Sequence, residues 1–217
     1  MPVSFRPLAL LALLAVPAAA RAQFAVYTDL ASFLAATSGA GTDTFDDLAA
    51  GPLSTPLARS AGAFGYVASV TTTSLFAVGP TDDRWLSANT ATDVITFTGF
   101  GPSVRGVGGF FFGTDLNGLF RPATSLTLRA TGAGGTTTWT LAAATPGTFL
   151  GFVSTAGIGS LTVETVLPAA DLAWPTVNAL VLAGAPTVDV VPEPATVVLL
   201  GAGVLGLALA SGRRRGR

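Results

Sequence analysis

The middle of the chain is a succession of short apolar or alternating runs separated by Gly, Pro, Asp and Asn. Runs of this kind, rich in Val, Thr, Phe and Leu, suit the pleated and half-buried surface of an antiparallel sheet. The pattern predicts an all-β fold, an antiparallel jelly-roll-like β-sandwich of about eight strands. The predicted strands are 64–70, 93–100, 104–112, 125–130, 136–142, 148–153, 160–166 and 176–182.

One short helix is expected before these strands. Thr28 has the side chain of a helix N-cap, and Leu30, Phe33 and Leu34 fall on one helical face. The Ser38-Gly39 pair then ends the pattern. We therefore expect an N-terminal helix that packs on the sandwich.

The aromatic residues allow a test of this pattern. Phe110–Phe112 are consecutive, and successive side chains of a strand point to opposite faces, so two are expected in the core and one on the other face. A central strand packed on both sides is favoured over an aromatic platform for a sugar ring. Trp139 alternates with threonines and is expected to be buried, whereas Trp85 and Trp174 are expected to be exposed.

The N-terminus has the layout of a secretory signal peptide. Arg6 precedes an apolar core at 8–16, which is too short to cross a hydrocarbon layer of about 30 Å. Ala20 and Ala22 supply the small side chains that a signal peptidase requires before its cut. Gln23 is therefore the predicted first residue of the mature protein.

The C-terminus has the layout of a membrane anchor. An apolar run at 195–210 is followed by a cluster of arginines, and the positive-inside rule holds such a cluster in the cytoplasm. The pattern predicts a transmembrane helix at about 195–212, with the exported domain on the other side of the membrane. The membrane-orienting residues are Arg213, Arg214, Arg215 and Arg217.

The Pro192-Glu193-Pro194 triplet precedes this helix. Together with the apolar helix and the terminal arginines, it resembles the PEP-CTERM sorting signal of Gram-negative bacteria. The resemblance implies recognition by an exosortase, a membrane-embedded cysteine transpeptidase, with cleavage near the triplet and release to the cell surface or the extracellular matrix. Tails that resemble this one are also classified as the C-terminal domain of ice-binding proteins.

These features divide the chain into four parts. The exported domain lies between two targeting segments, so the inner membrane, the signal peptidase and the exosortase are its expected partners in export. The parts are a signal peptide at 1–22, the β-sandwich domain at 23–185, a linker at 186–191, and the sorting signal with its helix and arginine-rich cytoplasmic tail at 192–217.

Composition narrows the chemistry that the exported part can perform. Cys, His and Lys are absent, which excludes a Ser-His-Asp triad, a Cys-His pair, an ordinary zinc site and Schiff-base mechanisms. Residues 23–190 contain five arginines against eleven acidic residues, a net charge of −6. An acidic domain without a basic stripe also argues against a nucleic-acid partner.

Two segments have the oxygen-bearing side chains of a calcium loop. Asp115 and Asn117 alternate before a glycine, although the remaining acids of an EF-hand are missing. Asp46 and Asp47 form an early acidic loop that could share a structural calcium with Asn178 on a late strand. No cofactor is expected apart from this calcium.

The segments around these residues are similar to the exported domains of other PEP-CTERM proteins. The similar segments are 44–47, 107–111, 149–152 and 175–180. Asn178 stands where that resemblance implies an acidic residue, which weakens the assignment of a calcium ligand there.

Three classes of function remain. We favour a non-catalytic surface or matrix protein that contacts extracellular polysaccharide. The alternative is a carboxylate-based polysaccharide hydrolase or lyase that uses Asp46-Asp47 or Asp82-Asp83, although adjacent strand residues point to opposite faces and retaining hydrolysis needs carboxyl groups about 5 Å apart. The third is an ice-binding protein that uses the threonine row at 136, 138 and 140.

Overall fold

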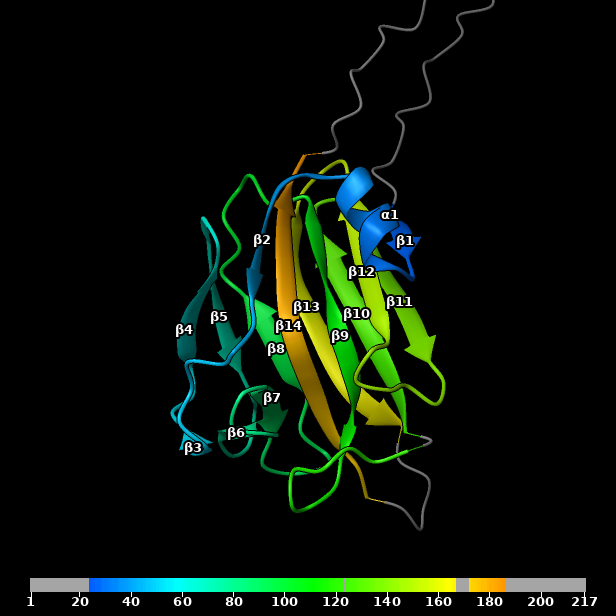
Figure 1. Ribbon diagram of the computed structural model, residues 1–217. Helices are drawn as coiled ribbons and strands as arrows, with labels where there is room; N and C mark the ends of the chain where they lie inside the picture. Colours follow the sequence, from blue (N-terminus) through cyan, green and yellow to red (C-terminus); the bar gives the residue numbers. More distant parts are fainter. Residues whose placement is uncertain (1–23, 123, 167–171, 186–217) are drawn as a thin grey trace, which may run out of the picture.

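The computed structural model describes residues 24–122, 124–166 and 172–185. In these residues two antiparallel sheets pack face to face, and one short helix lies beside them (Figure 1). The strand order does not confirm the jelly-roll connectivity. The all-β prediction, with its two antiparallel sheets and almost no helix, is confirmed.

The larger sheet has eight strands, and the second has six. The eight-stranded sheet runs β1 (Phe24–Tyr27), β12 (Phe149–Ser154), β9 (Gly106–Thr114), β14 (Trp174–Gly184), β7 (Trp85–Ala88), β6 (Leu75–Val78) and β3 (Gly51–Leu53), with β2 (Ser38–Asp43) also paired to β14. The six-stranded sheet runs β11 (Gly135–Leu141), β10 (Ser125–Gly132), β13 (Ile158–Val166), β8 (Ile95–Thr98), β5 (Phe64–Ser69) and β4 (Leu57–Ala61).

All eight predicted strands are present, with ends that shift by a few residues. The sequence pattern missed six strands, β1 to β4, β6 and β7, because each is only three to six residues long and offers little side-chain alternation to read. In strands that pair mainly through their backbones, side-chain alternation is a weak signal.

The core lies between the two sheets. Alternate residues of facing strands fill it, as the pleat requires. Its largest fully buried side chains include Phe97, Phe111, Phe152, Leu126, Leu128 and Leu150.

β9 is a central strand that packs on both faces, as its aromatic run predicts. Phe111 and Phe112 are fully buried in the main core cluster, and half-buried Phe110 packs with a second cluster that contains Phe33 and Phe149. Phe110 meets Phe149 edge-on at 5.5 Å between ring centroids. The three aromatic rings are therefore packing residues of the sandwich, and they do not form an open sugar platform.

The helix is α1 (Leu30–Ala35), and its cap differs from the prediction. Asp29, and not Thr28, is the N-cap, because its carboxylate accepts a hydrogen bond from the Ser32 amide at 2.8 Å. Phe33 is buried, but Leu34 is 42 % exposed. A single buried side chain therefore anchors this helix on the large sheet.

The predictions for two of the tryptophans were wrong. Trp85 is buried against Phe112, with ring centroids 4.8 Å apart, whereas Trp139 is 41 % exposed. Trp139 does lie on the inward side of β11, opposite Leu128, but β11 is the edge strand and the large sheet does not cover it. Trp174 is half-buried, and its indole N–H donates to the Asn89 carbonyl at 2.9 Å.

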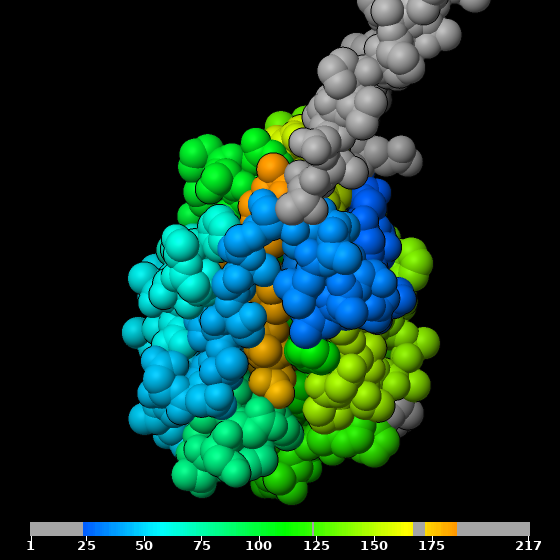
Figure 2. All heavy atoms as spheres, turned by 45° about the horizontal axis from the view of Figure 1, so that its top comes forward, coloured from blue at the N-terminus to red at the C-terminus, as the bar shows by residue number. Residues whose placement is uncertain are grey.

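β14 pairs with β9 along one edge, and on its other edge it changes its partner halfway along its length. Its N-terminal half pairs with β7 and its C-terminal half with β2, and a bulge with Ala179 at φ 58° separates the two. Figure 2 shows the N-terminal segment, in blue, lying against the orange β14. The bulge also places Asn178 beside the loop before β7, where it contacts Asp83.

The predicted signal peptide, linker and sorting tail fall outside the described residues. This holds for the cleavage residues Ala20, Ala22 and Gln23, for the Pro192-Glu193-Pro194 triplet and for the terminal arginines. Within the described ranges, no helix combines the length and the apolar character that a membrane crossing needs.

Candidate functional site

Asp43 is the centre of a buried ion-pair cluster. Its side chain is 4 % exposed, and its carboxylate accepts from Arg59 Nε at 2.9 Å, Arg59 Nη2 at 2.6 Å and the Tyr66 hydroxyl at 2.6 Å. The Phe45 amide donates to the same carboxylate at 3.1 Å. Four donors therefore satisfy this buried charge.

The same arginine also binds Asp47. Arg59 Nη1 and Nη2 donate to the two Asp47 oxygens at 2.8 and 2.6 Å, although the Asp47 side chain is 70 % exposed. These bonds lower the pKa of Asp47, and the hydrogen bonds from Arg59 to Asp47 and Asp43 raise the pKa of the arginine. Burial, followed by the hydrogen bond to Asp43, raises the pKa of Tyr66.

The Asp43–Arg59–Asp47 cluster joins the two sheets. Asp43 ends β2 in the large sheet, whereas Arg59 and Tyr66 lie on β4 and β5 of the other sheet. Phe45, at φ 62°, turns the chain into the core, and the guanidinium carbon of Arg59 lies 5.8 Å from its ring centroid. An open depression lies over this cluster, but its charged groups already satisfy one another.

The residues predicted to bind calcium lie in two separate places. Asp46 is exposed and accepts from the Arg84 amide at 2.9 Å. Asp115 accepts from the amides of Asn117 and Leu119, both at 2.9 Å, which closes its loop. In the part of the chain that the structure describes, no three His, Cys, Asp or Glu residues gather as a metal site, and calcium binding stays a prediction.

Asn178 meets an acidic loop, but a different one from that predicted. Its side-chain amide donates to Asp83 at 3.1 Å, and the next residue, Arg84, holds Asp46 through its backbone. The structure therefore brings the 46–47 and 82–84 loops together beside β14. The sequence shows no sign of this contact, because 95 residues separate Asn178 from Asp83.

A buried hydroxyl cluster was missed by the sequence analysis. Ser87, Thr114 and Thr176 lie on three adjacent strands of the large sheet, and Thr176 Oγ1 is 2.8 Å from Thr114 Oγ1 and 3.0 Å from Ser87 Oγ. Ser87 also donates to the Pro175 carbonyl at 3.2 Å. These hydroxyls satisfy each other, and none of these bonds involves a base that would activate a nucleophile.

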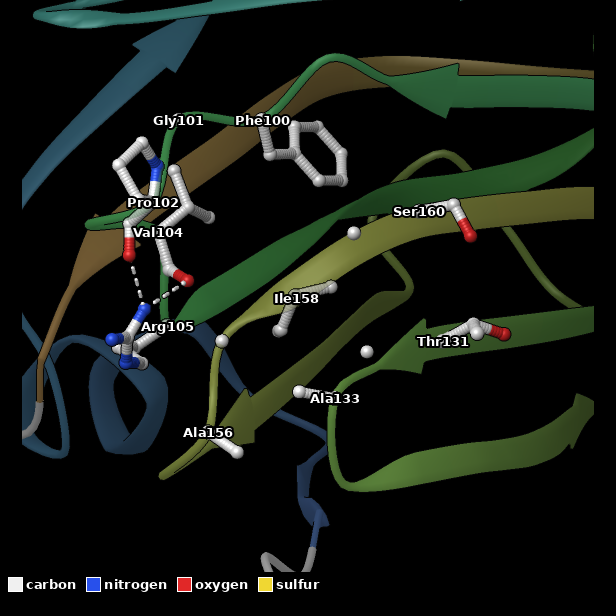
Figure 3. Close-up of a pocket in the computed structure, with 13 residues that line it drawn as sticks. Phe100, Gly101, Pro102, Val104, Arg105, Thr131, Ala133, Ala156, Ile158 and Ser160 are labelled. Atoms are coloured by element: carbon white, nitrogen blue, oxygen red, sulfur yellow. Dashed lines mark hydrogen bonds between the residues drawn. The ribbon is translucent and has the colours of Figure 1, made fainter.

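A pocket lies at one end of the sandwich, between three connections. The loop between β8 and β9, the β10–β11 hairpin and the β12–β13 turn surround a cavity of about 510 Å³ (Figure 3). Its lining is mainly apolar and glycine-rich, with Arg105, Thr131 and Ser160 as its polar side chains. The volume falls in the range of small-molecule binding sites.

The outward face of the six-stranded sheet carries rows of hydroxyl groups. The threonines at 136, 138 and 140 each pair with a residue of β10 and, beyond it, with one of β13. Two charged residues, Arg129 and Glu164, interrupt the array. The three rows are Thr136–Thr131–Ser160, Thr138–Arg129–Thr162 and Thr140–Thr127–Glu164.

Among family models, that of the PEP-CTERM protein-sorting motif matches residues 190–215. The chain carries a PEP-CTERM sorting motif. The resemblance of the Pro192-Glu193-Pro194 tail is thereby confirmed, and the motif supports an exported protein that is processed as the substrate of an exosortase. No curated protein and no solved structure matches the chain.

Proposed function

We propose that this protein is a non-catalytic component of the cell surface or extracellular matrix of a Gram-negative bacterium, and that it associates with polysaccharide there. The observation that carries the proposal is the PEP-CTERM motif at residues 190–215, attached to a β-sandwich. The motif indicates a sorted substrate. The polysaccharide association is our extension from it, supported by the open pocket of the exported domain.

The route to the surface follows from the two ends of the chain. A signal peptidase removes residues 1–22, the C-terminal helix then holds the protein in the inner membrane, and Arg213–Arg215 and Arg217 stay in the cytoplasm. An exosortase recognises Pro192-Glu193-Pro194 and releases the exported domain. The two prolines fix φ and lack amide donors, so they favour an extended segment that an enzyme can bind.

The acidic residues support a binding protein more than a hydrolase. Asp47 is held by Arg59, Asp46 by the Arg84 amide and Asp83 by Asn178. Carboxylate catalysis needs two carboxyl groups that face each other across a substrate cleft. The contacts of these acids favour no such pair, so the hydrolase or lyase alternative gains no specific support.

Ice binding is the second candidate, and the hydroxyl rows of the six-stranded sheet favour it. The structure places the 136–140 threonines beside hydroxyl groups of β10 and β13, an array that the sequence does not show. Arg129 and Glu164 lie within the rows, so we place this function after polysaccharide association. Thermal hysteresis of the purified protein that disappears in Thr138→Lys would support it, and a freezing curve equal to that of an inert protein would exclude it.

The sorting proposal is tested by replacing Pro192, Glu193 and Pro194 together with alanine. The matched control replaces Thr187, Val188 and Asp189, which precede the motif. We expect the triplet variant to stay in the inner-membrane fraction while the control reaches the surface. Unchanged release of the triplet variant would refute sorting by this motif.

A further inference from the structure

Arg105 is held in a fixed position at the edge of the loop-end pocket. It directly precedes β9, its amide donates to the Ala183 carbonyl at 2.9 Å, and its carbonyl accepts from the Ser154 amide at 2.8 Å. These bonds tie its backbone to the ends of β14 and β12. The side chain therefore projects from rigid elements, as a preorganised binding group requires.

Among the residues that the structure describes, none pairs a carboxylate with the guanidinium of Arg105. Its Nη1 atom donates to the carbonyls of Pro102 at 2.6 Å and Val104 at 3.1 Å (Figure 3). Across residues 24–122, 124–166 and 172–185, the ion pairs of the structure involve Arg59 and do not involve Arg105. No acidic residue lines the pocket either. Its positive charge, in a domain with an excess of acids, is thus left for an anion from outside.

The rest of the pocket suits a sugar ring. Phe100 and Ile158 offer apolar surface, and the hydroxyls of Thr131 and Ser160 lie on paired positions of β10 and β13 (Figure 3). An aromatic ring can contact the C–H face of a sugar, whereas hydroxyls bond to its polar edge. A ligand that combines a ring, hydroxyl groups and a negative charge would use all of these groups.

We propose that this pocket binds a carboxylate-bearing sugar residue, such as a uronic acid unit, of an acidic polysaccharide. The planar guanidinium of Arg105 pairs with the sugar carboxylate through the Nε and Nη2 donors, a geometry that arginine forms bidentately. Phe100 contacts the apolar face of the ligand, and Thr131 and Ser160, on the opposite side of the pocket from Arg105 (Figure 3), bind hydroxyl groups of an adjoining sugar unit. This inference builds on the proposed association with polysaccharide and specifies its ligand class and site.

Two glycines allow a test that leaves the arginine in place. Gly159 is the extra residue of a bulge between β10 and β13, and a Cβ there would meet only the Thr131 carbonyl oxygen at an ordinary 3.6 Å. Gly159→Leu therefore adds a bulky side chain to the pocket lining without backbone strain. Gly147, in the loop between β11 and β12, has similar free space and does not line the pocket, so Gly147→Leu is its matched control.

The experiment measures binding of the full-length chain, purified in detergent, to immobilised alginate, dextran sulfate and neutral dextran. We expect binding to alginate, and a loss of roughly tenfold or more in Arg105→Gln, since a charge-assisted bond is worth at least one power of ten in affinity. Gly159→Leu should show the same loss. Arg129→Gln and Gly147→Leu should bind like the unmodified chain, and equal unfolding midpoints should show that all four variants are folded.

Three results would overturn the proposal in distinguishable ways. Alginate binding that survives both Arg105→Gln and Gly159→Leu would place the site elsewhere and leave polysaccharide association intact. Equal binding to dextran sulfate would show a general polyanion site and not a carboxylate site. Failure to bind any polysaccharide would refute the pocket assignment together with the proposed association, while sorting by the C-terminal motif would be unaffected.

Discussion

Replacement of Asp43 by alanine is the strongest test of the cluster that joins the two sheets. The substitution removes a buried carboxylate that pairs with Arg59 and leaves the Tyr66 hydroxyl and the Phe45 amide without their acceptor. Loss of one partner of a buried ion pair costs about 3–5 kcal/mol. Arg59 keeps its two bonds to Asp47, so we expect the lower end of this range, about 3 kcal/mol.

Asp47→Ala is the matched control, because Asp47 binds the same guanidinium from an exposed position. Its side chain is 70 % exposed, and exposed ion pairs contribute at most about 1 kcal/mol. Tyr66→Phe removes one hydrogen bond to the buried carboxylate and should fall between the two, at about 1.5–2 kcal/mol.

Denaturant unfolding, monitored by tryptophan fluorescence, measures the unfolding free energy of each variant, and a thermal melt checks the result. For a domain of this size, a loss of about 3 kcal/mol corresponds to a decrease in Tm of roughly 6–12 °C. Equal effects of Asp43→Ala and Asp47→Ala, or a loss below about 1 kcal/mol for Asp43→Ala, would refute the view that the buried pair holds the sheets together.

Three further predictions follow from the packing and the charges. Gly41→Ala should destabilise the fold by about 1–3 kcal/mol in a chemical melt, because the new Cβ would collide with the backbone carbonyl of Ala61. Gly65→Ala meets no atom within 4 Å and should be better tolerated. Phe111→Ala should cost about 3–5 kcal/mol in the same assay, and a loss near that of Trp139→Ala, which is 41 % exposed, would contradict the assigned core. Because the pKa of Asp47 is lowered in the folded state, its stabilising contribution is present above the ordinary value of 3.8 and is lost as the pH falls through the lowered value. The difference in unfolding free energy between the unmodified chain and Asp47→Asn should therefore close below about pH 4. A difference that grows in acid would be inconsistent with this sign.

The predictable strands are those in which apolar side chains that face the core alternate with polar side chains that face solvent. Residues such as those of β10, SLTLRATG, alternate between core and solvent, and this alternation is readable in the sequence. β2, with the sequence SGAGTD, is a strand because its backbone pairs with β14 and because Gly41 lets the two sheets approach closely. Nothing in its side chains indicates this pairing.

The tryptophans show the limit of alternation. The pattern placed Trp139 on the correct face of β11, but only the order of strands shows that β11 is an edge strand with no sheet opposite this side chain. Trp85 is expected to be exposed because it stands beside Arg84. It is buried because Phe112 of β9 packs against it.

The site residues were predictable only where their contacts are local. The loop of Asp115, Asn117 and Gly118 is a turn that the sequence suggests, and its bonds span two to four residues. The Asp43–Arg59 pair and the contact of Asn178 with Asp83 join segments distant in the chain. The pocket at Arg105 likewise needs three connections that meet only in the folded sandwich.

The central claim, that the C-terminal tail is a sorting signal removed by an exosortase, is tested most directly by the intact mass of the released protein. The measurement compares cells of a Gram-negative host with and without the exosortase. The account predicts that the released chain begins at Gln23 and ends near Pro192-Glu193-Pro194, and that it disappears from the surface fraction when the exosortase is absent. Release of a chain that still carries Arg213–Arg217, or equal release in both strains, would contradict it.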